Sequence, residues 1–311
     1  MGNGRAETPC AGGRHIKAGA KAKKRRNCSV RPNFATDRPN NASMTSRIIN
    51  RITALLVMVL AGFQAEAQGL FSLDSRETAL AWEGVGRVEI SDDAFCTGAL
   101  IDERTVLTAA HCLFDPRTGY AKPAHTLQFR AGWRSGRAAA YRAVRKVALH
   151  PDYDPKGPTA GRVANDLALL ELQHPIRNTT IAAFATGPEP ATGASVGVVS
   201  YAHDRAAAPS LQDTCGVMGV QQSILILSCT VDFGASGSPV FVTGADGVHR
   251  IVSVISAKAQ ADGQPVSLGA PVAVALETLR GVLDSDRVAG VGATPMAAGT
   301  RRDTGAKFVT P

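Results

Sequence analysis

The chain has 311 residues, a formal net charge of +8 and a 44% hydrophobic composition, which suits one large domain or two small ones. The charge is uneven, because residues 1–67 hold 12 of the 34 Lys and Arg but only 3 of the 26 Asp and Glu. Nucleic-acid binding needs clustered positive charge to replace counterions. The near-neutral remainder of the chain therefore excludes nucleic acid as a partner, and the basic character belongs to a leader.

Residues 44–67 have the order of a secretory signal peptide. Arg47 and Arg51 form a charged region, an apolar run follows at 52–63, and Ala-Glu-Ala stands at 65–67. This is the pattern of a charged n-region, a short h-region and a cleavage site. The apolar run is shorter than the roughly 20 residues that span a bilayer. We expect cleavage to leave no stable membrane anchor; an uncleaved N-terminal anchor is the alternative.

Residues 1–43 precede this signal and are rich in Lys, Arg, Asn and Gly without an apolar period. The composition predicts a disordered basic extension. One hypothesis is that translation starts at Met44, so that the extension is not made; the other is a long basic n-region. In either case the signal predicts a secreted or periplasmic protein.

The body predicts an all-β fold, because short segments rich in Val, Ile and Leu recur between Gly, Pro and Asp clusters. Residues 151–163 are expected to form a loop, 272–283 have helical spacing, and 287–311 read as a flexible tail. The expected strands are 84–90, 97–101, 106–110, 127–131, 142–149, 167–172, 194–201, 225–229, 239–242 and 250–257.

Four cysteines follow the signal: Cys96, Cys112, Cys215 and Cys229. Export implies an oxidising compartment, in which an even number of cysteines usually pairs. Three pairings exist; the local one closes two loops of about 15 residues, each bond contributing roughly 3 kcal/mol in the chain-entropy model. Zinc is the competing interpretation, but no C-x-x-C pair is present. We expect no metal and no other cofactor.

Three segments together carry a nucleophilic chemistry. They contain His111 in LTAAHC, Asp166 in NDLALLEL and Ser236 in GASGSP. A serine hydroxyl is a weak nucleophile and needs an imidazole to take its proton, which His111 would do. A carboxylate on the other ring nitrogen fixes the tautomer, and Asp166 fits this role. The order His, Asp, Ser is that of one of the known triads.

The developing oxyanion of such a reaction needs two N–H donors, for which we expect the amides of Gly234 and Ser236. Asp152 and Asp154 are rivals to Asp166 for the carboxylate role, but they stand in a Pro-rich segment.

These motifs resemble those of trypsin/chymotrypsin-like serine peptidases, as does the segment FCTGALI at 95–101. The resemblance covers roughly residues 80–280, and its G-x-S-G-S-P form is closer to bacterial, glutamyl-endopeptidase-like members. It implies two six-stranded antiparallel β-barrels with a C-terminal helix. We assign 76–185 to the N-terminal barrel, with His111 and Asp166, and 186–286 to the C-terminal barrel and helix, with Ser236.

The resemblance also implies a Cys96–Cys112 disulfide, beside which we expect Cys215–Cys229, as in the local pairing. It implies a substrate pocket around four further residues, of which Ser256 would border Asp166. The four residues are Thr230, Ser256, Ala257 and Lys258.

Three positions depart from patterns that are usual in the family. Ala235 replaces the acidic residue that pairs with a new N-terminal amine after zymogen cleavage, so we expect activation not to use that pair. Thr230 stands where trypsin has its Lys/Arg-selecting aspartate. Lys258 stands where a pocket-wall glycine is usual, and would either attract an acidic side chain or point to solvent.

The resulting prediction is an exported, monomeric serine endopeptidase that acts on a protein or peptide substrate through an acyl-enzyme. The alternative is a catalytically inactive homologue that acts as a binding protein. A chaperone-protease with a C-terminal PDZ domain is disfavoured, because about 25 residues after the last helix cannot hold that domain.

Overall fold

The computed structural model describes residues 69–91, 94–115 and 117–285. The expected basic extension (1–43), signal peptide (44–67) and C-terminal tail (287–311) lie outside these residues. Strands make up most of the secondary structure that is described, and the helices are short. In the part of the chain that the structure describes, no helix has both the length and the apolar character needed to cross a membrane.

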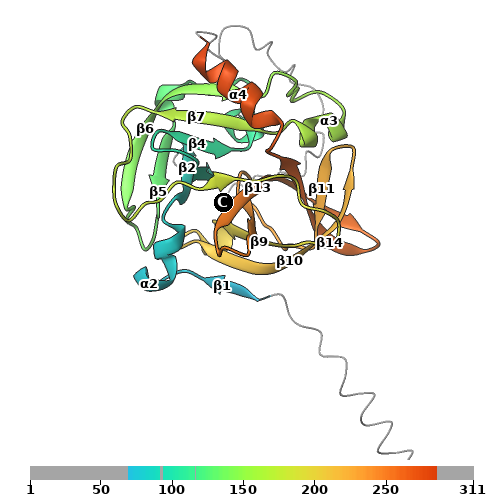
Figure 1. Cartoon of the computed structure of the whole chain (residues 1–311). Coiled ribbons are helices and arrows are strands. Elements are labelled where there is room, and N and C mark those ends of the chain that lie inside the picture. Colours follow the sequence, from blue (N-terminus) through green and yellow to red (C-terminus); the bar gives the residue numbers. More distant parts are fainter. Residues whose placement is uncertain (1–68, 92–93, 116, 286–311) are drawn as a thin grey trace, which may run out of the picture. The chain divides into compact units, whose positions relative to one another are not determined.

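A first barrel closes in the strand order β2-β3-β4-β7-β6-β5 (Figure 1). Its strands are β2 (Val85–Ser91), β3 (Ala94–Leu100), β4 (Thr105–Thr108), β5 (Gln128–Ala131), β6 (Ala140–Leu149) and β7 (Ala168–Leu172). Leu100, Leu107 and Leu170 are at most 1% exposed. Burial of such a side chain contributes about 1.5–3 kcal/mol, so the apolar runs of these strands hold the barrel together.

A second barrel closes because β9 pairs with both β10 and β12. The ring runs β9-β10-β11-β14-β13-β12, and β1 (Leu70–Ser72) and β8 (Ala185–Thr186) pair with β10 and β13 outside it. Its strands are β9 (Ser195–Ser200), β10 (Ser210–Gln221), β11 (Ile224–Leu227), β12 (Pro239–Thr243), β13 (His249–Ala261) and β14 (Gln264–Pro271). The predicted pair of six-stranded antiparallel barrels is confirmed. Strands β10 and β14 were not predicted.

The helices are α2 (Arg76–Ala79), α3 (Thr159–Ala164) and α4 (Ala275–Asp284). Helix α3 corrects the expectation of a plain loop over 151–163. Helix α4 is the predicted C-terminal helix and packs on β6 and β7. The Nζ atom of Lys146 on β6 donates to the carbonyls of Leu283 and Ser285, which satisfies acceptors at the helix end.

The described residues contain two disulfides. Cys96 on β3 is bonded to Cys112 with an S–S distance of 2.05 Å, and Cys215 on β10 is bonded to Cys229, just after β11. Each bond therefore joins neighbouring segments within one barrel.

Candidate functional site

His111 and Asp166 are brought together by the pairing of β4 with β7. These strands are antiparallel, with Thr108 opposite Ala168, so the end of β4 lies beside the start of β7. His111 follows β4 in the 3-10 turn Ala110–Leu113, and Asp166 lies two residues before β7 begins at Ala168. The strand register thus places both residues at the same edge of the first barrel.

The Asp166 carboxylate accepts three hydrogen bonds although it is almost fully buried. Its Oδ1 accepts from the backbone N–H of His111 at 2.8 Å, and its Oδ2 lies 2.6 Å from His111 Nδ1. Oδ2 also accepts from the Ser256 hydroxyl. Because an ionised carboxylate can only accept, Nδ1 carries the proton of the shared bond. Nε2 is therefore the nitrogen that is left to act as a base.

Ser256 reaches Asp166 from the second barrel through an irregularity in β13. The register of β13 against β14 shifts between Ile255 and Ala257, so Ser256 stands at a β-bulge. Bulges re-aim side chains, often beside active sites. Here the bulge directs a hydroxyl across the boundary between the two barrels onto Asp166.

The pKa of His111 is raised above the 6.5 of an ordinary histidine. Burial lowers this pKa, but the charge of Asp166 and the hydrogen bond to it raise it by more, and the charge of Arg162 opposes them weakly. The imidazolium is thus stabilised by the carboxylate, which is what a group that accepts a proton during a reaction needs.

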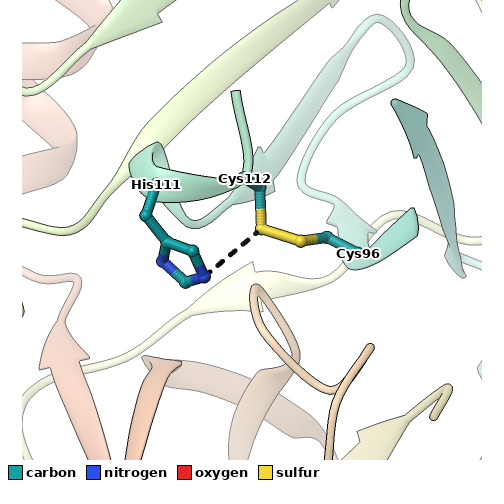
Figure 2. A group of neighbouring side chains, drawn as sticks. All are labelled: Cys96, His111 and Cys112. Carbon is teal, nitrogen blue, oxygen red and sulfur yellow. Dashed lines mark hydrogen bonds between the residues drawn. A yellow bond between two sulfur atoms is a disulfide. The ribbon is translucent and has the colours of Figure 1, made fainter. Parts of the chain in front are cut away.

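The Nε2 atom of His111 lies 3.9 Å from Cys112 Sγ. Figure 2 shows this contact as a dashed line beside the Cys96–Cys112 disulfide. The ligand atoms of Cys96, His111 and Cys112 all fall within 4.8 Å of one another, as in a metal site. The two sulfur atoms are bonded to each other, however, and metal ligation needs thiolates. In this oxidised form the cluster is a disulfide beside an imidazole.

Ser236 stands in the loop between β11 and β12 and is half-buried. Its carbonyl accepts from the Thr97 N–H at 2.8 Å, and Thr97 adjoins Cys96, which is bonded to Cys112 beside His111. Ser236 is thereby tied to the segment that carries His111. Among the described residues, the Ser236 hydroxyl has no hydrogen-bond partner, so its contact with Nε2 is not made in this structure. Catalytic hydrogen bonds often tighten only when substrate binds.

All five backbone carbonyls of residues 232–236, here called the 232–236 loop, accept hydrogen bonds. The acceptors at 232, 233, 234, 235 and 236 receive bonds from Ala235 N–H, His203 N–H, Thr97 Oγ1, Ser238 N–H and Thr97 N–H, respectively. Within the described chain, by contrast, the N–H groups of Gly234 and Ser236 donate to no protein acceptor. The loop therefore engages all five of its carbonyls, whereas the N–H groups of Gly234 and Ser236 are unused.

Glycine is required twice in this segment. Gly234 has φ +92° and Gly237 has φ +80°, both in the left-handed region. A Cβ atom on Gly237 would lie 2.2 Å from the Thr97 carbonyl oxygen and 2.3 Å from Thr108 Oγ1. Any side chain at this position would push the loop away from the first barrel.

Thr97 was missed as a site residue at the level of sequence. It is fully buried, and its N–H and hydroxyl donate to Ser236 and Gly234, while its Oγ1 also accepts from Tyr201 N–H at 3.1 Å. Its position directly after Cys96 in the FCTGALI segment was the sequence feature that could have identified it.

The four predicted pocket residues have different surroundings in the structure. Ser256 contacts Asp166, and Lys258 forms an ion pair with Asp232 at 3.2 Å. Thr230 is exposed and its N–H donates to Gln212 Oε1, and Ala257 is half-buried opposite Leu268. Their role as a pocket remains a prediction.

The rival carboxylates do not reach His111. Asp152 and Asp154 are exposed, and the Asp154 carboxylate accepts from the Lys156 N–H in its own turn. Asp166 is the carboxylate that contacts the imidazole.

A family model described as Trypsin matches residues 75–278. The chain belongs to the trypsin family. The match includes the His111–Asp166 contact, the 232–236 loop and both barrels.

Two curated relatives each share 28% identity with part of the chain. A glutamyl endopeptidase from Bacillus licheniformis is 28% identical over 148 residues, which cover 47% of this chain and 45% of that protein. Serine protease 23 from Rattus norvegicus is 28% identical over 196 residues, covering 56% and 49%. The chain thus spans about half the length of these relatives.

A solved structure of the same fold is that of "Glu endopeptidase in complex with MPD". It superimposes with a TM-score of 0.56 at 16% identity, covering 68% of this chain and 95% of that one. This likeness supports the two-barrel fold.

Proposed function

We propose that this chain is an exported serine endopeptidase that hydrolyses peptide bonds through Ser236, His111 and Asp166. The observation that carries the proposal is the pairing of His111 with the buried, three-fold hydrogen-bonded Asp166, at an edge where the Ser236 loop docks. Family membership supports the reaction class.

In the proposed mechanism the Ser236 hydroxyl attacks the carbonyl carbon of the scissile peptide while His111 Nε2 takes its proton. Asp166 holds the Nδ1 proton and stabilises the imidazolium. His111 then returns the proton to the leaving amine, which leaves an acyl group on Ser236. Water, activated by His111, hydrolyses this ester in the second half of the reaction.

The oxyanion of both tetrahedral intermediates would be bound by the Gly234 and Ser236 N–H groups. The hydrogen-bonding pattern of the 232–236 loop supports this role, because all five carbonyls are engaged elsewhere and cannot repel a developing negative charge. Loss of one such donor typically lowers kcat about 10²–10³-fold.

We further propose that the protein is secreted or periplasmic, that it is monomeric, and that 76–185 and 186–286 are its two domains. The two disulfides support an oxidising compartment, where such bonds persist. The substrate would be a protein or peptide, and the chemistry requires no cofactor.

The alternative, an inactive homologue, gains its support from the unpartnered Ser236 hydroxyl. A fluorophosphonate probe separates the two, since it labels only an activated serine. We expect the wild-type chain to be labelled and Ser236→Ala to be unlabelled, with a loss of peptidase kcat of about 10⁶-fold.

Ser238 provides the matched control, because it lies in the same GASGSP segment. It is fully buried and its hydroxyl has no hydrogen-bond partner among the described residues. Ser238→Ala should therefore keep labelling and activity. Folded wild-type protein that remains unlabelled would contradict the enzymatic proposal and favour the binding protein.

A further inference from the structure

Three side chains, those of Asp232, Phe233 and Lys258, meet at the 232–236 loop. Lys258 Nζ lies 3.2 Å from Asp232 Oδ1 and 4.1 Å from the centroid of the Phe233 ring. The same Oδ1 atom accepts from the Phe233 N–H at 2.8 Å. The Lys258 ammonium is thus held by both a carboxylate and an aromatic face, which attract cations by different means.

The electrostatics of Asp232 agree with this geometry. Burial raises the pKa of the Asp232 carboxyl, but the hydrogen bonds from Phe233 N–H and Lys258, with the charges of Lys258 and Arg205, lower it by more. The pKa of Asp232 therefore lies below its usual range, so its carboxyl group is ionised at neutral pH.

The peptide that joins Phe233 to Gly234 is the part of the loop that these contacts orient. Its carbonyl accepts from the His203 N–H at 2.8 Å, and its N–H is the unused donor of Gly234. Because Gly234 tolerates both signs of φ, this peptide can turn over at a low energetic cost. It would then present a carbonyl where the donor is now.

Few contacts oppose that turn. The His203 N–H bond fixes the carbonyl, and the Asp232–Lys258 pair fixes the Phe233 side chain and N–H on the preceding peptide. The side chains of Asp232 and Lys258 are 51% and 44% exposed. An exposed pair is weak, but a weak contact suffices to select between two orientations of similar energy.

We infer that Lys258 and Asp232, acting through Phe233, are positioning residues that keep the Gly234 N–H directed at the oxyanion. The inference rests on the proposed function. In this inference Lys258 acts on the oxyanion site and does not contact the substrate. The alternative is that Lys258 selects substrates by attracting an acidic side chain next to the scissile bond.

The experiment compares wild type, Lys258→Met, Lys258→Arg and Asp232→Asn on peptides that differ only in having Glu, Gln or Leu before the scissile bond. Lys258→Met should lower kcat about five- to twentyfold on all three peptides with little change in KM, a fraction of the effect of losing an oxyanion donor. Lys258→Arg keeps the charge and the ring contact and should keep kcat.

Asp232→Asn retains an acceptor for the Phe233 N–H but removes the charge, so the expected fall in kcat is smaller, about two- to fourfold. In the double variant Asp232→Asn/Lys258→Met the losses should not add, because both changes break one contact.

Asp246 supplies the control. It lies in the turn between β12 and β13 and forms an ion pair with Arg250. Its side chain is 51% exposed, as is that of Asp232. Asp246→Asn should leave kcat unchanged.

The outcomes are separable. Unchanged kcat in Lys258→Met would overturn the inference, as would an effect confined to KM for the Glu peptide, which would make Lys258 a specificity residue. Urea unfolding excludes a general loss of structure, and rescue by Lys258→Arg excludes a purely steric effect. Failure of the wild-type chain to react with a fluorophosphonate would refute the proposed function instead.

Discussion

The two barrels hold their parts of the site by different means. The first barrel fixes His111 and Asp166 through side-chain hydrogen bonds around a buried carboxylate. The second barrel presents its part mainly through the backbone, in a loop whose carbonyls are all engaged and whose exposed side-chain contacts are weak. In the proposed mechanism, proton transfer therefore relies on buried side chains, and charge stabilisation relies on the direction of peptide groups. The predictions below test this division.

Among the variants that test this difference between the barrels, Asp166→Asn should cause the largest loss of kcat. The amide cannot hold the correct His111 tautomer, so kcat should fall about 10⁴-fold although the fold persists. Steady-state kinetics with a circular dichroism control measures this. A fall of less than tenfold would show that the first barrel does not govern proton transfer.

Ser256→Ala tests the side-chain hydrogen bond from the second barrel to Asp166. A hydrogen bond to a charged group contributes about 1.5–3 kcal/mol, so the free energy of unfolding should fall by about 2 kcal/mol and kcat about tenfold. Urea denaturation and kinetics measure the two effects.

Ser253 on the same strand is the matched control, because its hydroxyl donates to the neutral Ala270 carbonyl and is fully buried. Ser253→Ala should cost about 1 kcal/mol and leave kcat unchanged. If both variants behave alike, Ser256 is structural and the barrels are more independent than we infer.

The smallest change is expected in pH dependence. His111 must be neutral to act as a base, and its pKa lies above 6.5, so kcat/KM should rise with pH with a midpoint above 6.5. In Asp166→Asn the midpoint should move down, because the carboxylate that raises the pKa is gone. A midpoint that does not move would show that Asp166 does not set this pKa.

The same shift predicts a trend in stability. Because the fold favours the protonated form of His111, its contribution to the free energy of unfolding is complete below pH 6.5. It is lost as the pH rises through the raised pKa.

The sequence predicted all six strands of the first barrel but only four of the second. Strand β14 was missed because two prolines and a glycine interrupt it, although Asp262-Gly263 before it, with φ +50° and +75°, is a typical hairpin signal. Strand β10 was missed because its hairpin to β11 turns on Gln222 and Ser223. Both adopt positive φ without the glycine or asparagine that marks such turns.

The site was predictable where it depends on residue identity and not where it depends on peptide direction. The motifs named His111 and Asp166, which lie in contact, and the resemblance placed Ser256 beside Asp166. No sequence pattern could give the bulge that aims Ser256, the carbonyl pattern of the 232–236 loop, or the Lys258–Asp232–Phe233 contact. Each of these depends on segments that meet only after the barrels close.

Gly237 lies where the two barrels pack together, so the site depends on their docking. Because it has no side chain, the peptide after Ser236 lies directly against Thr97 and Thr108 of the first barrel. Neither half of the chain can complete this arrangement alone, so the site forms only when the barrels dock, and is lost as soon as they separate. Inactivation by heat should then report separation of the barrels before either of them has unfolded.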